Sequence, residues 1–472
     1  LKNDGGKNMR LKKALAVAVT GALVVGSMAG CGSKKDSSSS KDGASKGKDA
    51  VTYESVKLGE TGKDLKTTIT MFNNRTDLDS DKYNGTTWKQ YLAEFNKMYP
   101  NITVKIKTDT NYADDALTHL QSGDYETIMG IPSIDKSDLS TYFISYGTLD
   151  DMKKQVNYSN TWEYDGDVYG VASLATTQGI VYNKKVFEKA GITELPKTPE
   201  EFIDALQKIK DNTDAIPLYT NYAAGWTMGA WDAYIGINAT GDNTYMNQKL
   251  VHTKDPFKDY GDDTHAYSVY KILYDAVNQG LTEEDYSTTD WEGCKVKIND
   301  GKIGCMVLGS WSYPQMAAAG KNGDDIGYMP FPISIDGKQY ASAGADYSYG
   351  INANATNDEK EAAMIFVKWL TEKSGYCYNE GGLPVIAGNT DTKLAFDNVS
   401  LIEDEAALKG EEDYLNDMNS ESELNINNSG NDKIQSIIES ASKGDKKFDD
   451  IMKEWNKKWS DAQDTNGIKV TD

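Results

Sequence analysis

The feature that most constrains this chain is a regular alternation of short apolar strands and amphipathic helices, which begins near residue 66. Thr67–Phe72 alternates with period two, which predicts a strand, and Trp88–Tyr99 carries apolar residues at helical spacing. A strand over 102–106, a helix over 113–121 and a short buried strand over 127–131 are predicted next. Strands alternating with helices indicate a doubly wound α/β unit.

A second α/β unit is predicted after residue 178. Gly179–Asn183 reads as a strand, followed by a helix over 184–190. Thr198 is placed to cap the next helix, with Pro199 at its first position and Glu201 completing a capping box. Further segments are predicted as helices over 267–279 and 358–371, a buried strand over 302–309, and a helical C-terminal stretch over 434–459.

The N-terminal region has the three parts of an export signal. We expect Met9 to be the start, followed by a basic stretch, an apolar run over 14–25 and small residues before Cys31. The run is too short to cross a bilayer core, which takes about 20 apolar residues. Met28–Cys31 resembles the lipobox of bacterial lipoproteins, which implies removal of residues 1–30 and acylation of Cys31. An ordinary signal peptide that happens to contain a cysteine is the alternative.

The segment after Cys31 is a predicted tether. Gly32–Ala50 is rich in Ser, Lys, Asp and Gly and has no apolar residue larger than alanine, so it is expected to stay disordered. Residues 31–65 are assigned to the lipidated cysteine and a disordered tether, and the folded part is expected to begin near Val51 and to be firmly under way by Lys66.

Composition excludes several classes of function. The formal net charge of −22 argues against a nucleic-acid partner and against direct adsorption to anionic lipid. The histidines are scattered, and Lys82 and Trp88 stand where a calcium loop beginning at Asp77 needs Gly and Glu. No metal or cofactor is therefore predicted. Cys294 and Cys305 are open to two interpretations, a disulfide or buried free thiols.

An ordered series of motifs resembles the extracellular solute-binding proteins (family 1) of carbohydrate ABC importers, the class to which maltose-binding protein belongs. No block is strong alone, but they occur in the family's order over most of the chain after the tether. They are 167–171, 179–191 and 196–202, then 301–306 with 309–311, then 326–332, and finally 349–352 with the helix over 361–370. The lipoprotein signal is what Gram-positive members carry.

The resemblance implies the fold and its domains. It implies two doubly wound α/β lobes of the periplasmic binding protein type II class, joined by a hinge that the chain crosses several times, with a helical C-terminus. The first lobe is expected to comprise 66–173 and 330–372, and the second 174–329 and 373–472. The crossings are predicted near 172–177, 328–332 and 370–375. The ligand would lie between lobes that close on it by hinge bending.

Candidate ligand-binding residues follow from the chemistry of sugars. A pyranose presents C–H bonds on its face, which aromatic rings cover, and hydroxyls at its edge, which polar side chains pair. Trp311 resembles the family's stacking tryptophan, with packing between lobes as the alternative. At least one of three aromatic residues after the 216–219 strand is expected to line the cleft, with core packing as each one's alternative. These are Tyr222, Trp226 and Trp231.

Polar candidates complete the predicted site. Three follow the first strand, where family members bind hydroxyls: Asn73, Asn74 and Arg75. Arg75 is a candidate bidentate donor, with a surface arginine as the alternative. Asp346 and Tyr347 lie just before a predicted strand, and Asp346 is expected to accept hydroxyl hydrogens. Thr176 is at the first crossing, where the family places an acidic or polar contact.

The leading hypothesis is a non-enzymatic sugar receptor, for an oligosaccharide given the several aromatic candidates. It is expected to act as a monomer, lipid-anchored on the outer face of the cell membrane, where it delivers its ligand to the transmembrane subunits of an ABC permease. Two alternatives are a surface lipoprotein enzyme acting on glycans, and a receptor for another solute such as a peptide or an anionic compound. The sequence does not name the sugar, its linkage or its length.

Overall fold

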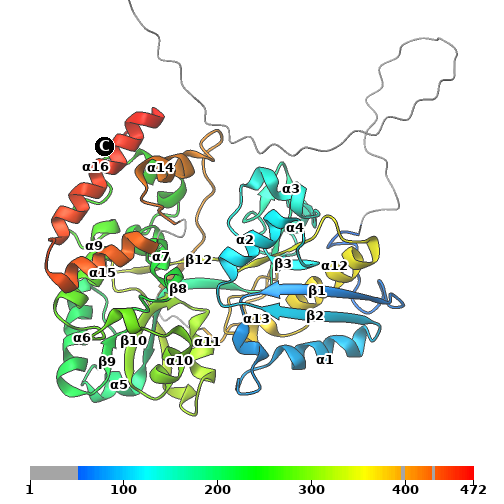
Figure 1. The fold of residues 1–472 in the computed structure, drawn as a ribbon, viewed down its shortest axis with the longest axis horizontal. Coiled ribbons are helices and arrows are strands. Elements are labelled where there is room, and N and C mark those ends of the chain that lie inside the picture. The colour runs from blue at the N-terminus through cyan, green and yellow to red at the C-terminus, as the bar shows by residue number, and fades with distance from the viewer. Residues whose placement is uncertain (1–50, 395–398, 428–430, 472) are drawn as a thin grey trace, which may run out of the picture. The chain divides into compact units, whose positions relative to one another are not determined.

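Two β-sheets, each covered by its own helices, carry the described part of the chain (Figure 1). The structure is a computed structural model and describes residues 51–394, 399–427 and 431–471. The predicted export signal, the lipobox and the tether up to residue 50 lie outside the described residues. The two groups of elements are called the first and the second lobe below.

The first lobe is built on a five-stranded sheet with the strand order β2-β1-β3-β13-β7. Strand β1 pairs in parallel with both β2 and β3, as the strand–helix alternation predicts, whereas β13 is antiparallel to β3 and β7. The strands are β1 (Thr67–Asn73), β2 (Ile102–Thr108), β3 (Ile128–Gly130), β7 (Val171–Ala172) and β13 (Ser348–Ile351).

Helices of the first lobe bury their apolar stripes against this sheet. Thr87 caps α1 in a capping box with Gln90, and Thr356 caps α12 in the same way with Glu359. The main helices are α1 (Trp88–Met98), α2 (Tyr112–Ser122), α12 (Asn357–Glu372) and the short α13 (Tyr376–Asn379). Smaller elements are α3 (Leu139–Tyr142), α4 (Leu149–Met152), and a three-stranded sheet of β4 (Gly147–Thr148), β5 (Glu163–Tyr164) and β6 (Asp167–Val168).

Two predicted boundaries of the first lobe are wrong. Residues 51–65, predicted as tether, are folded onto it, because Tyr53 and Val56 are buried in the same core as Trp88 and Phe366. Residues 376–380, predicted for the second lobe, also belong here, because Tyr376 packs in that core and Glu380 pairs with Arg75.

The second lobe has a six-stranded sheet in the order β14-β12-β8-β10-β9, with β11 also paired to β8. Strand β8 begins beside the first lobe and runs through the second, as Figure 1 shows. The strands are β8 (Ala175–Asn183), β9 (Ile216–Leu218), β10 (Ile303–Gly309), β11 (Ile326–Met329), β12 (Gln339–Ala345) and β14 (Val399–Ile402).

Helices cover both faces of this sheet. Thr198 caps α6 as predicted by accepting from the Glu201 amide, but the Glu201 carboxylate accepts from Lys197 N–H rather than closing the box. The helices are α5 (Lys184–Lys189), α6 (Pro199–Asn212), α7 (Trp226–Gly229), α8 (Ile237–Thr240), α9 (His265–Asn278), α10 (Trp291–Asn299), α11 (Ser312–Ala318), α14 (Tyr414–Ser422), α15 (Asn431–Lys443) and α16 (Phe448–Asn466).

The C-terminal helical stretch is two helices rather than the single segment predicted over 434–459. Gly444 follows α15 with φ of 64°, a left-handed conformation that ends a helix without strain only for glycine. Both helices then bury apolar residues in the core of the second lobe, among them Ile438 and Trp459. No helix in the described ranges is long and apolar enough to cross a membrane.

The chain passes between the two sheets more than once. The first crossing is at Ser173–Leu174, between β7 and β8, as predicted. The second is at Asp346–Tyr347, between β12 and β13, and not at 328–332. The reason is that β12 pairs with β8 over Ala343–Ala345 and so keeps residues 330–345 in the second lobe. The third follows α13, since β14 pairs with β12.

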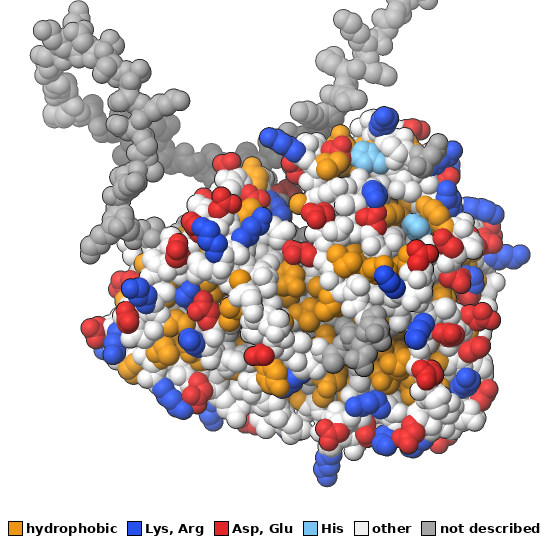
Figure 2. All heavy atoms as spheres, turned by 180° about the vertical axis from the view of Figure 1, so that it is seen from behind, with side chains coloured by type: hydrophobic (Ala, Val, Ile, Leu, Met, Phe, Trp, Pro, Cys, Tyr) orange, Lys and Arg blue, Asp and Glu red, His pale blue; other side chains and the backbone are white. Residues whose placement is uncertain are grey.

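Surface charge is mixed on the face shown in Figure 2. Acidic and basic side chains are interspersed over its periphery, and apolar side chains gather toward the middle. The described cysteines are all free, with Cys294 and Cys305 buried, so the free-thiol interpretation holds. Among the described residues, no group of three or more His, Cys, Asp or Glu could hold a metal ion.

Candidate functional site

The candidate site lies where strands of both lobes end. In open α/β sheets ligands bind beyond the carboxyl ends of the strands, because loops diverge there. In the first lobe this edge holds Asn73–Arg75 after β1, and in the second it holds Thr220–Tyr222 after β9 and Trp311 after β10. The crossing strands β8 and β12 connect the two edges.

Three tryptophans from three segments meet at the second lobe's edge. Trp311 begins the turn into α11, Trp226 opens α7 and Trp291 opens α10. The ring centroids are 5.0 Å apart for Trp226–Trp291, and 5.6 Å apart for both Trp226–Trp311 and Trp291–Trp311. Trp226 is 38% exposed, whereas Trp291 is buried. The cluster thus presents an apolar aromatic surface suited to the C–H face of a sugar.

Glycine at the end of β10 lets the Trp311 ring lie across the strand. A Cβ on Gly309 would lie 2.4 Å from Trp311 Nε1 and 3.4 Å from Gln178 Oε1. The first distance is far below van der Waals contact, so any side chain here displaces the ring. Gln178 is a polar neighbour of the tryptophan cluster that the sequence analysis did not single out.

Three buried polar atoms near the strand ends have no hydrogen-bond partner in the described protein. They are Asn73 Nδ2 at the end of β1, Asn221 Oδ1 after β9 and Thr177 Oγ1 in β8. Leaving such a group unpaired costs about 1–3 kcal/mol. Asn221 also has a left-handed backbone, with φ of 60°. Unpaired polar groups and local strain are typical of ligand sites. Asn221 and Thr177 were also missed from the sequence.

Thr176 and Asp346 lie at the two crossings. Thr176 pairs with Gly344 across β8 and β12 and is buried. The Asp346 amide donates to the Leu174 carbonyl, and its carboxylate accepts from the Tyr347 amide at 2.8 Å. Burial raises the pKa of Asp346, although this amide and the Arg75 charge act against it. Asp346 is therefore a partly desolvated carboxylate and a candidate acceptor for sugar hydroxyls.

Tyr347 and Asn74 are placed on the first lobe's side of the site. The Tyr347 ring packs edge-on against Tyr112 at 5.0 Å and lies beside Gly130 at the end of β3. Asn74 is exposed in the turn after β1. Both lie at the carboxyl edge of the first sheet, where the sequence placed them, and their role in binding stays a prediction.

Arg75 is neither a surface arginine nor a free bidentate donor. Its guanidinium donates twice to Asp77, at 2.9 Å each, once to Glu380 at 2.5 Å and once to Tyr376. Four of its five N–H groups are therefore used within the first lobe. Tyr83 and Tyr91 also donate to the buried Glu380 carboxylate. The role of the Arg75 side chain is therefore mainly structural, and at most one N–H is left for a ligand.

Charges from the two lobes meet beside this network. Burial tends to raise the pKa of Asp77, but Arg75 and then Lys295 of α10 hold it below its ordinary value. Lys295 Nζ lies 4.9 Å from the centre of the Trp291 ring. Asp77 is thus a largely buried partner of Arg75, with its side chain 10% exposed. This electrostatic influence of Lys295 brings a charge of the tryptophan cluster within reach of the Arg75 network.

Tyr222 and Trp231 differ from Trp226 in their surroundings. Trp231 is 2% exposed and packs beside Tyr234 and Phe331 in the second lobe's core, so the core-packing alternative describes it. The Tyr222 hydroxyl donates to Glu439 of α15 at 2.6 Å, and its ring packs on Tyr286. Of the three predicted aromatics, Trp226 has the ring that joins Trp311.

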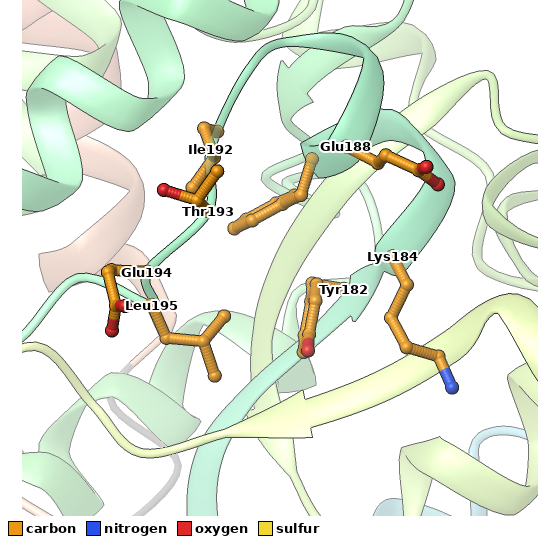
Figure 3. A pocket seen from close by; sticks show the side chains of 8 residues that line it. Tyr182, Lys184, Glu188, Ile192, Thr193, Glu194 and Leu195 are labelled. Carbon is orange, nitrogen blue, oxygen red and sulfur yellow. The ribbon is translucent and has the colours of Figure 1, made fainter.

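Two surface pockets are lined by none of the candidate residues. One of about 350 Å³ is bounded by Tyr182 and the loop Ile192–Leu195, with the Lys184 amine pointing away from it (Figure 3). Tyr182 is near the far end of β8, eight residues beyond Leu174 at the crossing, or roughly 26 Å at 3.3 Å per residue. A groove of about 700 Å³ lies between residues 153–160 and 383–392 and includes Ala343. Ala343 pairs with Thr177, on the face of β8 opposite to Thr176.

The comparisons with known proteins identify the family. The family model described as bacterial extracellular solute-binding protein matches residues 79–376, well over half of the chain. The chain belongs to this family. The resemblance inferred from the motifs is therefore confirmed, and so is the two-sheet α/β fold class. Since the relatives are binding proteins, this solute-binding protein is not an enzyme.

Solved structures with high similarity bind manno-oligosaccharides. This solute-binding protein is 56% identical to BlMnBP2 of Bifidobacterium animalis subsp. lactis, a manno-oligosaccharide-specific solute-binding protein in complex with mannotriose; the TM-score is 0.85, over 88% of this chain and 99% of that one. It is 57% identical to BlMnBP1 of the same organism, a binding protein of an ABC transporter in complex with mannobiose, with the same TM-score and coverage.

A curated relative is more distant. The multiple sugar-binding protein of Streptococcus mutans is 25% identical over 335 residues, which cover 68% of this chain and 76% of that protein.

Proposed function

We propose that this solute-binding protein captures a manno-oligosaccharide between its lobes and delivers it to the permease of an ABC importer. The observation that carries the proposal is the identity of 56–57%, at a TM-score of 0.85, to two binding proteins solved with mannobiose or mannotriose. At such identity, spread over nearly the whole of those chains, the residues around a ligand are expected to be largely shared.

The chemistry of the candidate site supports a sugar. Trp226 and Trp311 offer flat apolar surface to a pyranose face, and Asn73, Asn221 and Asp346 offer polar groups to its hydroxyls. Both kinds of contact are needed, because a closed site that leaves polar groups unpaired loses about 1–3 kcal/mol for each of them. The proposed contact set retains Asn74, Thr176 and Tyr347, with Arg75 acting as their support.

Lobe closure accompanies capture in this proposal. The crossings at 173–174 and 346–347 are short connections with a bend at Ser173 and at Tyr347, and such connections can absorb a change in backbone angles. A ligand that contacts both lobes stabilises only the closed arrangement, and this differential affinity drives the closure.

Anchoring on the outer face of the membrane completes the proposed function. Cys31 would carry lipid, and Gly32–Ala50 would give the receptor reach while keeping it close to its permease. The extracellular family is consistent with this location. Replacing Cys31 with Ala is expected to move the protein from the detergent phase to the aqueous phase in Triton X-114 partitioning. Retention in the detergent phase would contradict anchoring through this residue.

Titration calorimetry with a panel of trisaccharides tests the ligand. We expect mannotriose and mannobiose to bind, and maltotriose, xylotriose and cellotriose to bind at least about tenfold more weakly, a difference of 1.4 kcal/mol. Binding of another trisaccharide with higher affinity than mannotriose would overturn the assignment to mannan. Neither alternative function gains support. The relatives are binding proteins, and Arg75, the candidate partner for an anionic solute, is already paired.

A further inference from the structure

A direct contact joins the lobes away from the crossing strands. Asn84 is in the loop between β1 and α1 of the first lobe, and its side-chain amide donates to two carbonyls of the second lobe. These are Ala318 O at 2.8 Å and Gly320 O at 3.3 Å, at the C-terminal end of α11. This is the helix that begins directly after Trp311.

The carbonyls at the end of α11 are shared between two asparagines. The last carbonyls of a helix have no partner within it. Asn299, from the second lobe itself, donates to the Met316 and Ala317 carbonyls at 2.9 and 3.3 Å. Asn84, from the other lobe, donates to Ala318 and Gly320. One half of this helix end is therefore paired within its own lobe, and the other half accepts from the opposite lobe at a site that solvent can reach.

The loop that carries Asn84 is held from behind. Its neighbour Tyr83 donates to Glu380 at 3.0 Å, and Glu380 is buried and paired with Arg75. The ring of Trp88, where α1 begins, donates to the Arg75 carbonyl. Asp77 of the same loop is within electrostatic reach of Lys295 on α10, the helix that packs beside α11. These hydrogen bonds hold the loop in place on the first lobe, with Asn84 facing the α10–α11 pair.

We propose that Asn84 is a closing latch: its amide binds the end of α11 only when the lobes close, and so slows release of the ligand. The inference rests on the proposed function, since it concerns how long the captured sugar stays. The latch touches α11 at the end opposite to Trp311, so it acts on the lobe arrangement and not on the sugar. It therefore adds to affinity without choosing between sugars.

The latch predicts a change in dissociation rather than in association. Opening must break the two hydrogen bonds of Asn84, of which the one to Gly320 O is long at 3.3 Å. Asn84→Ala is expected to raise the mannotriose dissociation rate about fivefold to tenfold with a nearly unchanged association rate. Asn84→Asp should have a larger effect, because an isosteric carboxylate loses the donor and repels the two carbonyl oxygens.

Stopped-flow and calorimetry on the purified chain test the latch with mannotriose and mannobiose as probes. Lys82→Ala, an exposed neighbour in the same loop, serves as the matched control and should keep wild-type rates. Asn299→Ala should lower the unfolding midpoint without ligand, because it opens the buried half of the helix end. Asn84→Ala should leave that midpoint nearly unchanged.

Two results would overturn the latch. One is a dissociation rate of Asn84→Asp equal to that of the wild type. The other is a different fold-change for mannobiose and mannotriose, which would make Asn84 a ligand contact. Failure of the proposed function is a separate result, because it shows as absence of mannotriose binding by the wild-type protein.

Discussion

At the scale of single residues, exposure separates side chains of the same type. Trp226 and Trp231 are five positions apart, yet the first is 38% exposed beside Trp311 and the second is 2% exposed in the core. Trp291, which opens α10, joins the same cluster although nothing in its local sequence indicates it. An indole ring serves both core packing and sugar stacking, so its type alone does not decide between these roles.

Trp226→Ala should weaken mannotriose binding about tenfold, or 1.4 kcal/mol, because it removes an aromatic surface that a sugar would cover. The unliganded protein should keep its unfolding midpoint, since the ring is half exposed already. Trp231→Phe is the control, with the opposite pattern: a loss of about 1–3 kcal/mol in stability from the cavity, and little change in affinity. Calorimetry and denaturant unfolding give both quantities. Equal losses of mannotriose affinity in the two variants would contradict the assignment of Trp226 to the site and of Trp231 to the core.

A second residue-scale prediction concerns Asp404. Burial, and then the neighbouring Glu403, raise the pKa of this carboxyl to about 6, and its Oδ1 has no hydrogen-bond partner in the described protein. An acid with a raised pKa in the folded state binds its proton more tightly there. The contribution of Asp404 to the free energy of unfolding is therefore most favourable below its pKa in the unfolded chain, about 3.9. This contribution is lost as the pH rises through about 6, the pKa in the folded protein.

Asp404→Asn should therefore stabilise the protein at pH 7.5 and not at pH 4. The expected gain is about 1–2 kcal/mol after allowance for partial solvent screening. Urea unfolding of wild type and variant at the two pH values measures it, with the exposed Glu421→Gln as control. A gain of equal size at both values would show that ionisation of Asp404 is not the cause.

At the scale of elements, the C-terminal helices depend on one buried ion pair. Lys433 of α15 donates twice to Asp232, at 2.6 and 2.8 Å, and Asp232 is completely buried. Asp232 also accepts from the Tyr270 hydroxyl and the Asn427 amide. The pair thus joins α15 to α9 and to the segment after α7. Periodicity predicted the helices, but their docking partner is about 200 residues away in sequence.

Lys433→Met should cost about 3–5 kcal/mol of stability, because it leaves the Asp232 carboxylate buried without its cation. Adding Asp232→Asn should recover part of the loss, since the amide oxygen still accepts from Tyr270 and carries no charge. Lys443→Met removes an exposed pair with Glu439 on the same helix and should change stability little. Denaturant unfolding compares the three variants. A similar cost for both lysines would contradict the role of the buried pair.

At the scale of the whole molecule, the division into lobes follows from strand pairing. The motifs predicted the first crossing within 172–177, because the chain leaves β7 and enters β8 there. They misplaced the second, since β12 adds to the second sheet through contacts with β8 far upstream. Short segments do not encode which sheet accepts a strand. Residues 376–380 fall in the first lobe for a different reason, since Tyr376 packs in its core and Glu380 pairs with Arg75.

Mannotriose should compact the molecule if the lobes close on it. We expect a smaller radius of gyration by small-angle X-ray scattering at saturation, and a gain of about 2.7 kcal/mol in stability at a ligand concentration of 100 Kd. Cellotriose at the same concentration is the control and should stabilise less, by at most about 1.4 kcal/mol, because a tenfold weaker ligand is then at no more than about ten times its own Kd. A stability gain with no change in radius would mean that binding occurs without closure.

The sequence by itself determined the local elements and the family. Alternating apolar positions, the Thr198 cap and the ordered motifs are local patterns, and local patterns are readable because neighbouring residues produce them. Only the tertiary structure decided that Trp226 and not Trp231 joins Trp311, that Arg75 is occupied by Asp77 and Glu380, and that Asn84 reaches α11. Each of the last two joins residues brought together by folding, over up to about 300 positions, and burial and partner choice depend on such distant neighbours.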